Sequence, residues 1–332
     1  MKPLAHAPIQ NSSIPSRSRF LGLRSGMPWS IGLALLLPGC DPGFAPGSEV
    51  SSLRVLAVQV DNPFASPGET VHLQALSYDP EARPITWAWA LCAEPASSNV
   101  ESCLADVART SAETGTLPLL GMGSGLDNID LTIAADALDR VPDVAKAQAL
   151  VGVVSVACPG TLELAPGTAA AQLPFRCIDD QGREFGLDEA IVGVKRVFLR
   201  EAERNQNPVV EQVLFDGELW EESDVKEVDG CDTEEHLIDD CASSLHHRLQ
   251  VRVSAASFES GIDEFGRDFR EQVIVQHYTE QGIVETAVRT AAESETNWVA
   301  RSRASGSEIR VWFVVRDDRG GVSWAERRVR VR

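Results

Sequence analysis

The chain has 332 residues, of which 49 are Asp or Glu and 30 are Lys or Arg, so its formal net charge at pH 7 is −19. A surface of this sign repels nucleic acid and anionic lipid headgroups, and the composition therefore argues against partners of either class. The length is enough for about two domains.

Residues 1–39 have the composition of an export signal. Four basic residues, Lys2, Arg17, Arg19 and Arg24, precede the first acidic residue of the chain, Asp41. The apolar run at 29–37 is too short to cross a bilayer as a helix, which favours a cleaved signal peptide over a transmembrane segment. Cleavage removes four positive charges and changes the net charge from −19 to −23.

The sequence Leu-Ala-Leu-Leu-Leu-Pro-Gly-Cys at 33–40 resembles the lipobox of bacterial lipoproteins. The resemblance implies that Cys40 is the first mature residue and carries a lipid that anchors the protein in a membrane. We expect the outer membrane, on its periplasmic or surface side, with the inner membrane as the alternative because an Asp follows Cys40. Ordinary secretion, or a Cys40 that is simply buried in the fold, is the alternative to lipidation. Residues 40–50, rich in Pro and Gly, are expected to form a tether.

Six cysteines follow Cys40, and an even number in an exported chain indicates disulfides. Six cysteines allow 15 pairings. Proximity in the sequence favours three local pairs, Cys92–Cys103, Cys158–Cys177 and Cys231–Cys241. Each bond would close a loop of polar or small residues, which restricts the unfolded chain.

Three strands are predicted near the start of the mature chain, at 53–60, 71–75 and 85–91. Turn residues separate the first two at 62–63 and 66–69. In the third strand, Trp87 and Trp89 alternate with small residues and share a face with Ile85 and Leu91. Because alternate residues of a strand point to the same side, both tryptophans are expected in the core.

These strands, with Pro-Gly-Glu-Thr before the second and Trp-Ala-Trp in the third, resemble immunoglobulin-like or PKD-like domains of bacterial surface lipoproteins. The resemblance covers residues 51–92 and implies an all-β fold with a tryptophan between two sheets. The inter-sheet disulfide of that family is missing, since the second strand has no cysteine. We expect two immunoglobulin-like β-sandwich domains, at 51–203 and 207–332.

Residues 93–147 are predicted to be a long, partly helical insertion in the first sandwich, and such excursions often carry binding surfaces. It would contain a loop at 121–125 and short helical turns at 133–148, broken at Pro142. Strands at 149–157 and 190–199 complete the first domain. The second would contain strands at 209–215 and 249–255 and two hairpins, formed by 273–278 with 283–290 and by 309–315 with 322–331.

The acidic segment 216–240 is the strongest candidate for a metal site. Cys231, His236 and Cys241 offer zinc ligands, but their spacing fits no common zinc pattern and export favours the disulfide. Calcium is an alternative for the carboxylates, although the segment lacks an Asp-x-Asp-x-Asp-Gly loop. The sequence therefore predicts a solvated acidic loop, with no metal and no cofactor.

Catalytic patterns are weak. The nucleophile elbow Gly-x-Ser-x-Gly is missing, since Met122 stands where the first glycine before Ser124 would be. His72 and His277 alternate within strands and have no local acid partner in the sequence. His246 and His247 are expected on the surface, and because neighbouring strand residues point to opposite faces they do not share one ion. We therefore expect a protein that is not an enzyme and has no catalytic residues.

Trp312 and Trp324 are predicted to share the outer face of the last hairpin, because their positions alternate with apolar residues. Exposed aromatic rings supply flat contact area, and this pair is the candidate binding surface. The expected function is an envelope binding or structural module with a protein or glycan partner. One alternative is a hydrolase or other enzyme with a site in 93–147. The other is an adhesin-like assembly subunit that uses its sheet edges.

Overall fold

The computed structural model describes residues 47–92, 100–164, 174–186, 189–202, 204–233, 237–263 and 265–332, and these described residues belong to one compact unit. The expected signal peptide and Cys40 lie outside the described residues. Among the residues described, no helix has the length and apolar character needed to cross a membrane.

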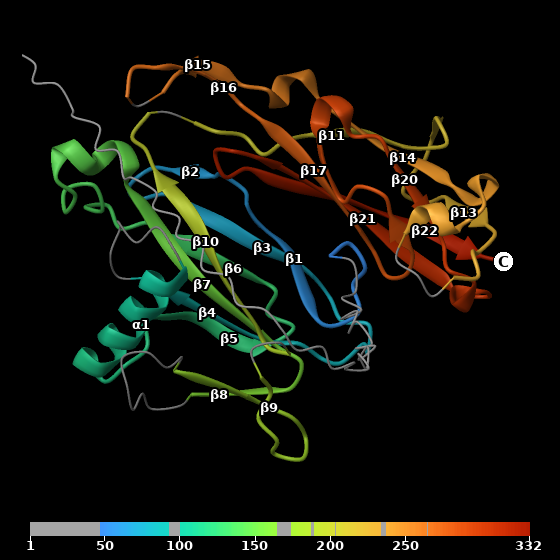
Figure 1. Ribbon diagram of the computed structural model, residues 1–332. Helices are drawn as coiled ribbons and strands as arrows, with labels where there is room; N and C mark the ends of the chain where they lie inside the picture. Colours follow the sequence, from blue (N-terminus) through green and yellow to red (C-terminus); the bar gives the residue numbers. More distant parts are fainter. Residues whose placement is uncertain are drawn as a thin grey trace, which may run out of the picture. The chain divides into compact units, whose positions relative to one another are not determined.

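The first sandwich consists of two sheets around one apolar core (Figure 1). One sheet has the order β1 (Arg54–Val60), β3 (Thr70–Tyr78), β6 (Asn128–Thr132). The other has the order β2 (Phe64–Ala65), β10 (Ile191–Leu199), β7 (Leu150–Cys158), β4 (Thr86–Leu91), β5 (Leu119–Ser124).

The second sandwich also has two sheets, each of five strands, around its own core. One sheet has the order β12 (Glu218–Leu219), β11 (Val210–Phe215), β14 (His247–Val253), β20 (Thr296–Val299), β18 (Ile283–Val284). The other has the order β13 (Val225–Val228), β22 (Val322–Val331), β21 (Glu308–Asp317), β17 (Val273–Thr279), β19 (Val288–Thr290).

Both sandwiches have the strand order of an immunoglobulin domain. In the first sandwich, the order β1-β3-β6 corresponds to strands A, B and E. In the second, the order β11-β14-β20-β18 corresponds to strands A, B, E and D. The orders β10-β7-β4-β5 and β22-β21-β17-β19 correspond to G, F, C and an added C′. In each sandwich a short strand, β2 or β13, pairs in parallel with the last strand. The expected fold class is confirmed, and the two halves share a topology although their sequences show no repeat.

Strand β4 has both faces buried. Trp87 and Trp89 are 1% and 0% exposed, with ring centroids 5.5 Å apart, and the Trp89 Nε1 donates to the Leu126 carbonyl at 2.8 Å. Ala88 and Ala90, on the opposite face, pack in a second cluster with Val107 of α1 (Val100–Thr114) and with both local disulfides of this sandwich. The small alanine side chains leave room for that second layer on the sheet.

Much of 93–147 belongs to the sandwich, which corrects the expected insertion. Strands β5 and β6 lie within it, α1 was not expected, and 121–125 is mostly strand instead of loop. The glycines of β5 suggested a loop. A Cβ on Gly121, however, would approach the ends of the Leu126 and Ile129 side chains to 2.8 and 3.0 Å, so this glycine lies in a closely packed strand. The helical turns are present in part as η1 (Asp143–Gln148) after Pro142.

The three disulfides are the pairs expected from the sequence. Cys92–Cys103 joins the end of β4 to α1. Cys158–Cys177 joins β7 to β9 (Phe175–Ile178), which pairs with β8 (Thr161–Leu164). Cys231–Cys241 encloses η2 (Ile238–Asp240), and the remaining short elements are η3 (Ser243–Leu245), η4 (Ala255–Ser257), β15 (Ser260–Ile262), β16 (Asp268–Arg270), η5 (Ala291–Glu293) and η6 (Ser302–Ala304).

The hairpin predicted from 273–278 and 283–290 is only partly correct. Strand β19 pairs with β17, but β18 crosses to the other sheet and pairs with β20. The crossing follows Gly282, whose φ is 132° and whose added Cβ would lie 2.4 Å from the Trp298 Nε1. The final hairpin, β21 with β22, is confirmed over its whole length.

Truncating Trp89 to alanine should lower the free energy of unfolding by ~3–5 kcal/mol, since the change leaves a cavity in the core. Trp89→Phe should cost less but still destabilise, because the Leu126 carbonyl loses its donor. Denaturant unfolding measures both values. Val144→Ala, at a side chain that is 93% exposed, is the control and should change little. Equal stability of Trp89→Ala and this control would show that the β4 face is not a core face.

Candidate functional site

The two sandwiches are joined through a buried apolar contact, called here the inter-sandwich contact. Its members come from the first sandwich and the segment before it (Val50, Leu56, Ala57, with Leu76 and Tyr78 partly buried) and from the second (Trp312, Val314, Val322, with Tyr278 and Trp324 partly buried). It covers the outer face of the β21–β22 hairpin.

A β-bulge in β1 creates the first sandwich's half of this contact. The register between β1 and β3 shifts between Val55 and Ala57, so one extra residue is accommodated. Leu56 and Ala57 consequently both pack in the inter-sandwich contact, while Val55 and Val58 pack against the core. This explains why the β1 sequence is apolar without a simple alternation.

The inter-sandwich contact corrects the candidate binding surface of Trp312 and Trp324. The two residues do belong to one outer face, as their positions predicted. That face is covered, however, and Trp312 is 1% exposed, with its Nε1 donating to Glu326 at 2.8 Å. Trp324 remains partly exposed. The alternation of a strand indicates which residues share a face, but not whether another domain covers that face.

The segment just before β1 also packs on the second sandwich, which corrects part of the expected tether. Ser48, Glu49 and Val50 are buried, and the Val50 N–H donates to the Thr279 carbonyl at 2.9 Å. The Glu49 carboxylate lies 3.5 Å from the Arg301 Nε and also pairs with Arg303. The ordered body therefore begins before residue 50.

A cleft of about 320 Å³, called here the junction cleft, is lined by residues of both sandwiches. The first sandwich provides Phe64 of β2, Phe198 of β10 and the adjacent Arg200. The second provides residues of the β15–β16 hairpin and of the β21–β22 turn: Asp263, Phe265, Arg267, Phe269, Asp318 and Arg319. Clefts of this size at domain junctions are common ligand sites.

Guanidinium groups alternate with aromatic rings in the junction cleft. The Arg319 Cζ lies 4.7 Å from the Phe64 ring centroid and 4.2 Å from that of Phe269. Arg200 lies 4.9 Å from the same Phe64 ring and 5.6 Å from Phe198. At these distances the ring faces attract the cations. The stack therefore holds the two sandwiches together and forms the base of the cleft.

The rim of the cleft is more open. Phe265 is 50% exposed, and Arg267 stacks on it at 4.9 Å while pairing with Asp263 at 2.8 Å. Asp263 also accepts the Phe265 and Arg267 backbone N–H groups, which fixes the turn. The rim thus offers a ring face, a guanidinium and a carboxylate, a combination suited to holding a polar ligand without a covalent step.

One carboxylate next to the cleft has a strongly shifted pKa. Burial, together with the carboxylates of Asp317 and Glu259, raises the pKa of Glu271 to about 7, and Arg319 opposes the shift from 3.5 Å. Glu271 accepts the Glu259 backbone N–H at 3.2 Å and is 4% exposed. It does not line the cleft and supports Arg319 from behind.

The histidines have partners that the sequence did not reveal. His72 and Asp130 lie 2.8 Å apart on the exposed faces of β3 and β6, and His247 and Asp216 lie 2.8 Å apart. His277 is fully buried, and burial lowers its pKa to about 4. None of the three histidines lines the junction cleft, and neither does Ser124, which ends β5.

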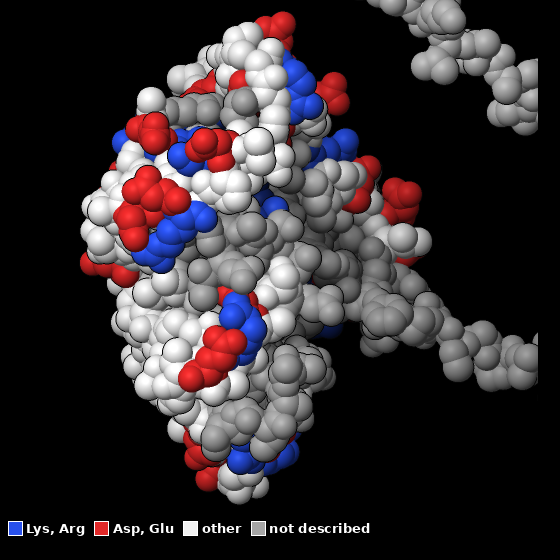
Figure 2. All heavy atoms as spheres, turned by 90° about the vertical axis from the view of Figure 1, so that its left-hand side faces the viewer, with Lys and Arg blue, Asp and Glu red and all other residues white. Residues whose placement is uncertain are grey.

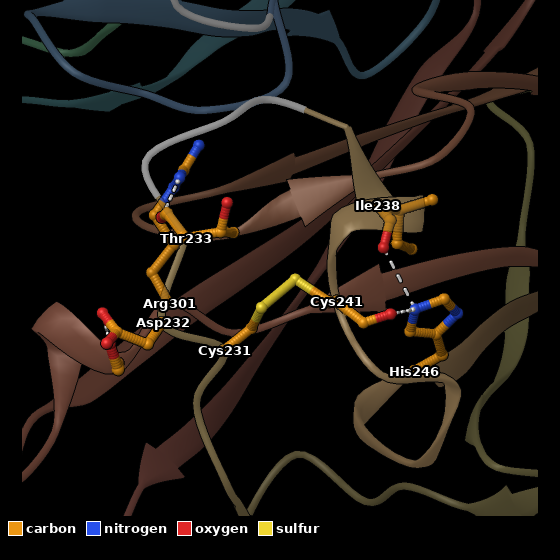
Figure 3. Close-up of a disulfide and its surroundings, with 8 residues drawn as sticks. Cys231, Asp232, Thr233, Ile238, Cys241, His246 and Arg301 are labelled. Carbon is orange, nitrogen blue, oxygen red and sulfur yellow. Dashed lines mark hydrogen bonds between the residues drawn. A yellow bond between two sulfur atoms is a disulfide. The ribbon is translucent and has the colours of Figure 1, made fainter.

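Figure 3 shows the surroundings of the Cys231–Cys241 disulfide, where the zinc alternative was considered. The ring Nε2 of His246 lies 3.1 Å from the carbonyl oxygens of both Ile238 and Cys241, so this nitrogen acts as a donor. A donor nitrogen cannot bind a metal ion in the same tautomer. His236 lies outside the described residues, and within the described ones no group of three or more His, Cys, Asp or Glu converges.

Figure 2 shows one face of the molecule, on which the blue Lys and Arg side chains lie against red Asp and Glu side chains. Uncharged surface separates these groups. Ion pairs such as Arg140–Asp136 and Arg183–Glu189 have the same character. Exposed pairs of this kind contribute little to stability.

Comparison with known proteins does not identify a family for this chain. No family profile and no curated protein matches the sequence. Matching solved structures include a chimeric titin Z1Z2 tandem (9% identity, TM-score 0.23, 84% of this chain and 99% of that chain). Another is the Ig1-2 module of the Drosophila receptor tyrosine phosphatase DLAR (9%, 0.23, 85% and 99%). A nucleoside hydrolase-related hypothetical protein from Saccharophagus degradans matches at 16% and 0.21, over 40% of this chain and 27% of that one. Similarities of this size carry no argument about function.

The sequence contained no clear signal for the junction cleft. Phe64 follows Asn62-Pro63 and Arg319 lies between two hairpin strands, so both belong to segments interpreted only as turns. Phe198 and Arg200 end a strand. The sequence shows only that aromatic and arginine residues occur at strand ends. These residues form a cleft only where the two sandwiches pack against each other.

The raised pKa of Glu271 predicts a pH dependence of stability. Between its ordinary value of 4.5 and about 7 the folded state binds more protons than the unfolded state, so this residue makes stability fall as pH rises through that window. Glu271→Gln cannot ionise and should melt at a higher temperature than the wild type at pH 8, with little or no gain at pH 4. The exposed Glu295→Gln is the control. A difference that does not change with pH would contradict the shift.

Proposed function

We propose that this protein is a lipid-anchored component of a bacterial envelope that acts as a binding module through its junction cleft. Lipidation at Cys40 places it at a membrane, with the outer membrane preferred. It acts on its partner by contact instead of by catalysis. The observation that carries the proposal is the cleft itself, whose Phe265, Arg267 and Asp263 stand at the rim of two sandwiches held together by a buried contact.

The chemistry of the rim indicates the class of ligand. Ring faces bind the apolar faces of sugars and the flat parts of side chains, while the guanidinium and carboxylate groups orient hydroxyl or amide groups by hydrogen bonds. A glycan or an exposed protein loop fits this combination. The rigid stack of Arg319 and Arg200 with Phe64 supports the rim, so little ordering is needed on binding.

The position of the proposed anchor limits where the body can act. Cys40 and Gly47, the first described residue, are seven positions apart. Even a fully extended chain of that length spans only about 25 Å. The start of the body, at Gly47, is therefore expected within about 25 Å of the lipid anchor.

Lipidation is tested by metabolic labelling with a palmitate analogue. The wild type should take up the label and partition with membranes, whereas Cys40→Ala should do neither. Cys40→Ser is a more conservative variant and should behave like the alanine. Label that persists in either variant would show that Cys40 is not the lipidated residue.

The cleft is tested by cross-linking on whole cells that express variants of the full chain. Phe265→Ala and Arg267→Ala remove a ring and a guanidinium from the rim and should strongly reduce the cross-linked adduct while leaving the melting temperature nearly unchanged, because both side chains are largely exposed. Val288→Ala changes an apolar side chain that is also 50% exposed and should retain the adduct. Equal loss in Val288→Ala, or no loss in the cleft variants, would exclude the cleft as the binding site.

A further inference from the structure

A second opening, called here the β10 groove, lies along the side of the first sandwich. It has a volume of about 250 Å³ and lies between residues 55–58 of β1 and 191–195 of β10, with Ser155 of β7 and Arg316 of β21 also contributing. It shares no lining residue with the junction cleft. Among the described strands, β1 is the outermost strand of its sheet, and β2 pairs only with the end of β10. Both β1 and β10 therefore present an unpaired strand edge at the groove.

The backbone of β10 is open along this groove. Strand β2 pairs only with Phe198 and Leu199, and the Phe198 N–H donates toward β2, to the Pro63 carbonyl at 3.1 Å. Because the pairing of β10 with β7 has no register shift, the N–H and C=O groups of Val192 and Val194 face the same way as those of Phe198. In the described part of the chain, β10 has no strand partner on this side before Phe198.

The open stretch is apolar, which is unusual for an exposed strand edge. Its sequence is Ile-Val-Gly-Val, with no charged residue before Lys195, and charged residues are a common protection of edges. Gly193 has no side chain to block close approach. Val55 and Val58 of β1 provide an apolar wall opposite. An added strand would therefore meet both free backbone groups and apolar surface.

Two cations stand at the end of the groove without a carboxylate in contact. The Lys195 Nζ donates to the Gly320 carbonyl at 2.8 Å, and Arg316 donates to the Leu56 carbonyl at 2.6 Å and to Gln276 at 2.7 Å. Among the described residues, neither forms an ion pair. Burial lowers the pKa of both, that of Lys195 to about 8, with a further lowering by Arg316 and an opposing effect of Asp317. The nearby Asp317 accepts the Arg319 and Gly321 backbone N–H groups instead.

We propose that the β10 groove binds an extended acidic segment of a partner protein, which adds a strand to the edge of β10 at Val192–Val194 and places a side-chain carboxylate against Lys195 and Arg316. Strand addition supplies affinity through main-chain hydrogen bonds, and side chains at alternate positions supply selectivity. The positive charge of Lys195 and Arg316, neither of which contacts a carboxylate within the described residues, selects an acidic side chain although the chain's overall charge is −19.

The second sandwich provides an internal comparison. Its opening at the same place in the fold lies beside Trp324–Arg328 of β22, where β13 pairs only with residues 328–331. This opening contains Glu222 and Glu326, and Arg327 donates to the Trp220 carbonyl at 2.6 Å. It therefore has acidic groups of its own and is not expected to prefer an acidic strand.

The test uses the purified full-length protein and two fluorescent peptides, Thr-Val-Thr-Glu-Val-Thr and the same sequence with Gln in place of Glu. Fluorescence anisotropy should show that the Glu peptide binds at least about tenfold more tightly than the Gln peptide, the effect of a charge-assisted contact. In Lys195→Met the ratio should fall to about one, whereas Lys226→Met, a half-buried lysine of β13, should retain it. Equal affinity for both peptides in the wild type, or binding of neither, would overturn the proposal.

A second measurement locates the site independently of charge. Hydrogen exchange of the complex should show new protection at residues 191–195, and protection at 322–327 instead would reject the β10 groove. Val194→Pro removes an outward N–H without touching the pairing with β7, so it should abolish binding of the Glu peptide. If Val194→Pro does not fold, Lys195→Met decides the matter, since Lys195 is half-buried and forms no ion pair within the described residues, so its replacement should leave the melting temperature nearly unchanged.

Discussion

The arrangement of the two sandwiches depends on burial of the outer face of the β21–β22 hairpin. Each large apolar side chain removed from water there contributes ~1.5–3 kcal/mol, whereas an exposed ion pair contributes at most about 1 kcal/mol. Trp312, Val314 and Val322 are all less than 4% exposed, so the apolar contact outweighs the ion pairs around it. The hydrogen bonds at its edge, such as Gln59 to the Val322 carbonyl at 2.6 Å, fix the register of a contact that hydrophobic burial drives.

The same strand order is stabilised by different cores in the two sandwiches. In the first, strand C carries Trp87 and Trp89 into the core, as the family resemblance implied. In the second, strand C is β17, and His277 occupies its buried face with its ring 5.6 Å from that of Phe313. The aromatic volume comes instead from Trp298 of β20 and from Trp220. Burial lowers the pKa of His277 to about 4, and the ring packs within the core.

Local patterns in the sequence predicted what depends on local physics. Alternation identified the strands around Trp89 and the final hairpin, and proximity identified all three disulfide pairs. The predictions of a loop at Gly121 and of an exposed ring at Trp312 were wrong for the same reason. Gly121 resembled a loop residue because the side chains that pack against it come from a later turn and strand. Trp312 resembled an exposed ring because the bulge at Leu56 that covers it lies far away in the chain. The junction cleft was invisible for the same reason, since Phe64 and Arg319 meet only after both domains have folded.

The choice of arginine at the junction follows from what the contact must do there. A guanidinium can stack on a ring with its flat face while its edge donates hydrogen bonds, whereas an ammonium group is compact and more strongly hydrated. Arg319 stacks between Phe64 and Phe269 and forms an ion pair with Glu271 at 3.5 Å. Arg200 likewise stacks on Phe64 and donates to the Ala149 and Leu199 carbonyls. Lys195 is the exception, because its single donor contact to Gly320 leaves two N–H groups of a half-buried ammonium to be satisfied by water or by a ligand. Lys195 is therefore the position at this junction where contact with an external carboxylate is expected to be most favourable.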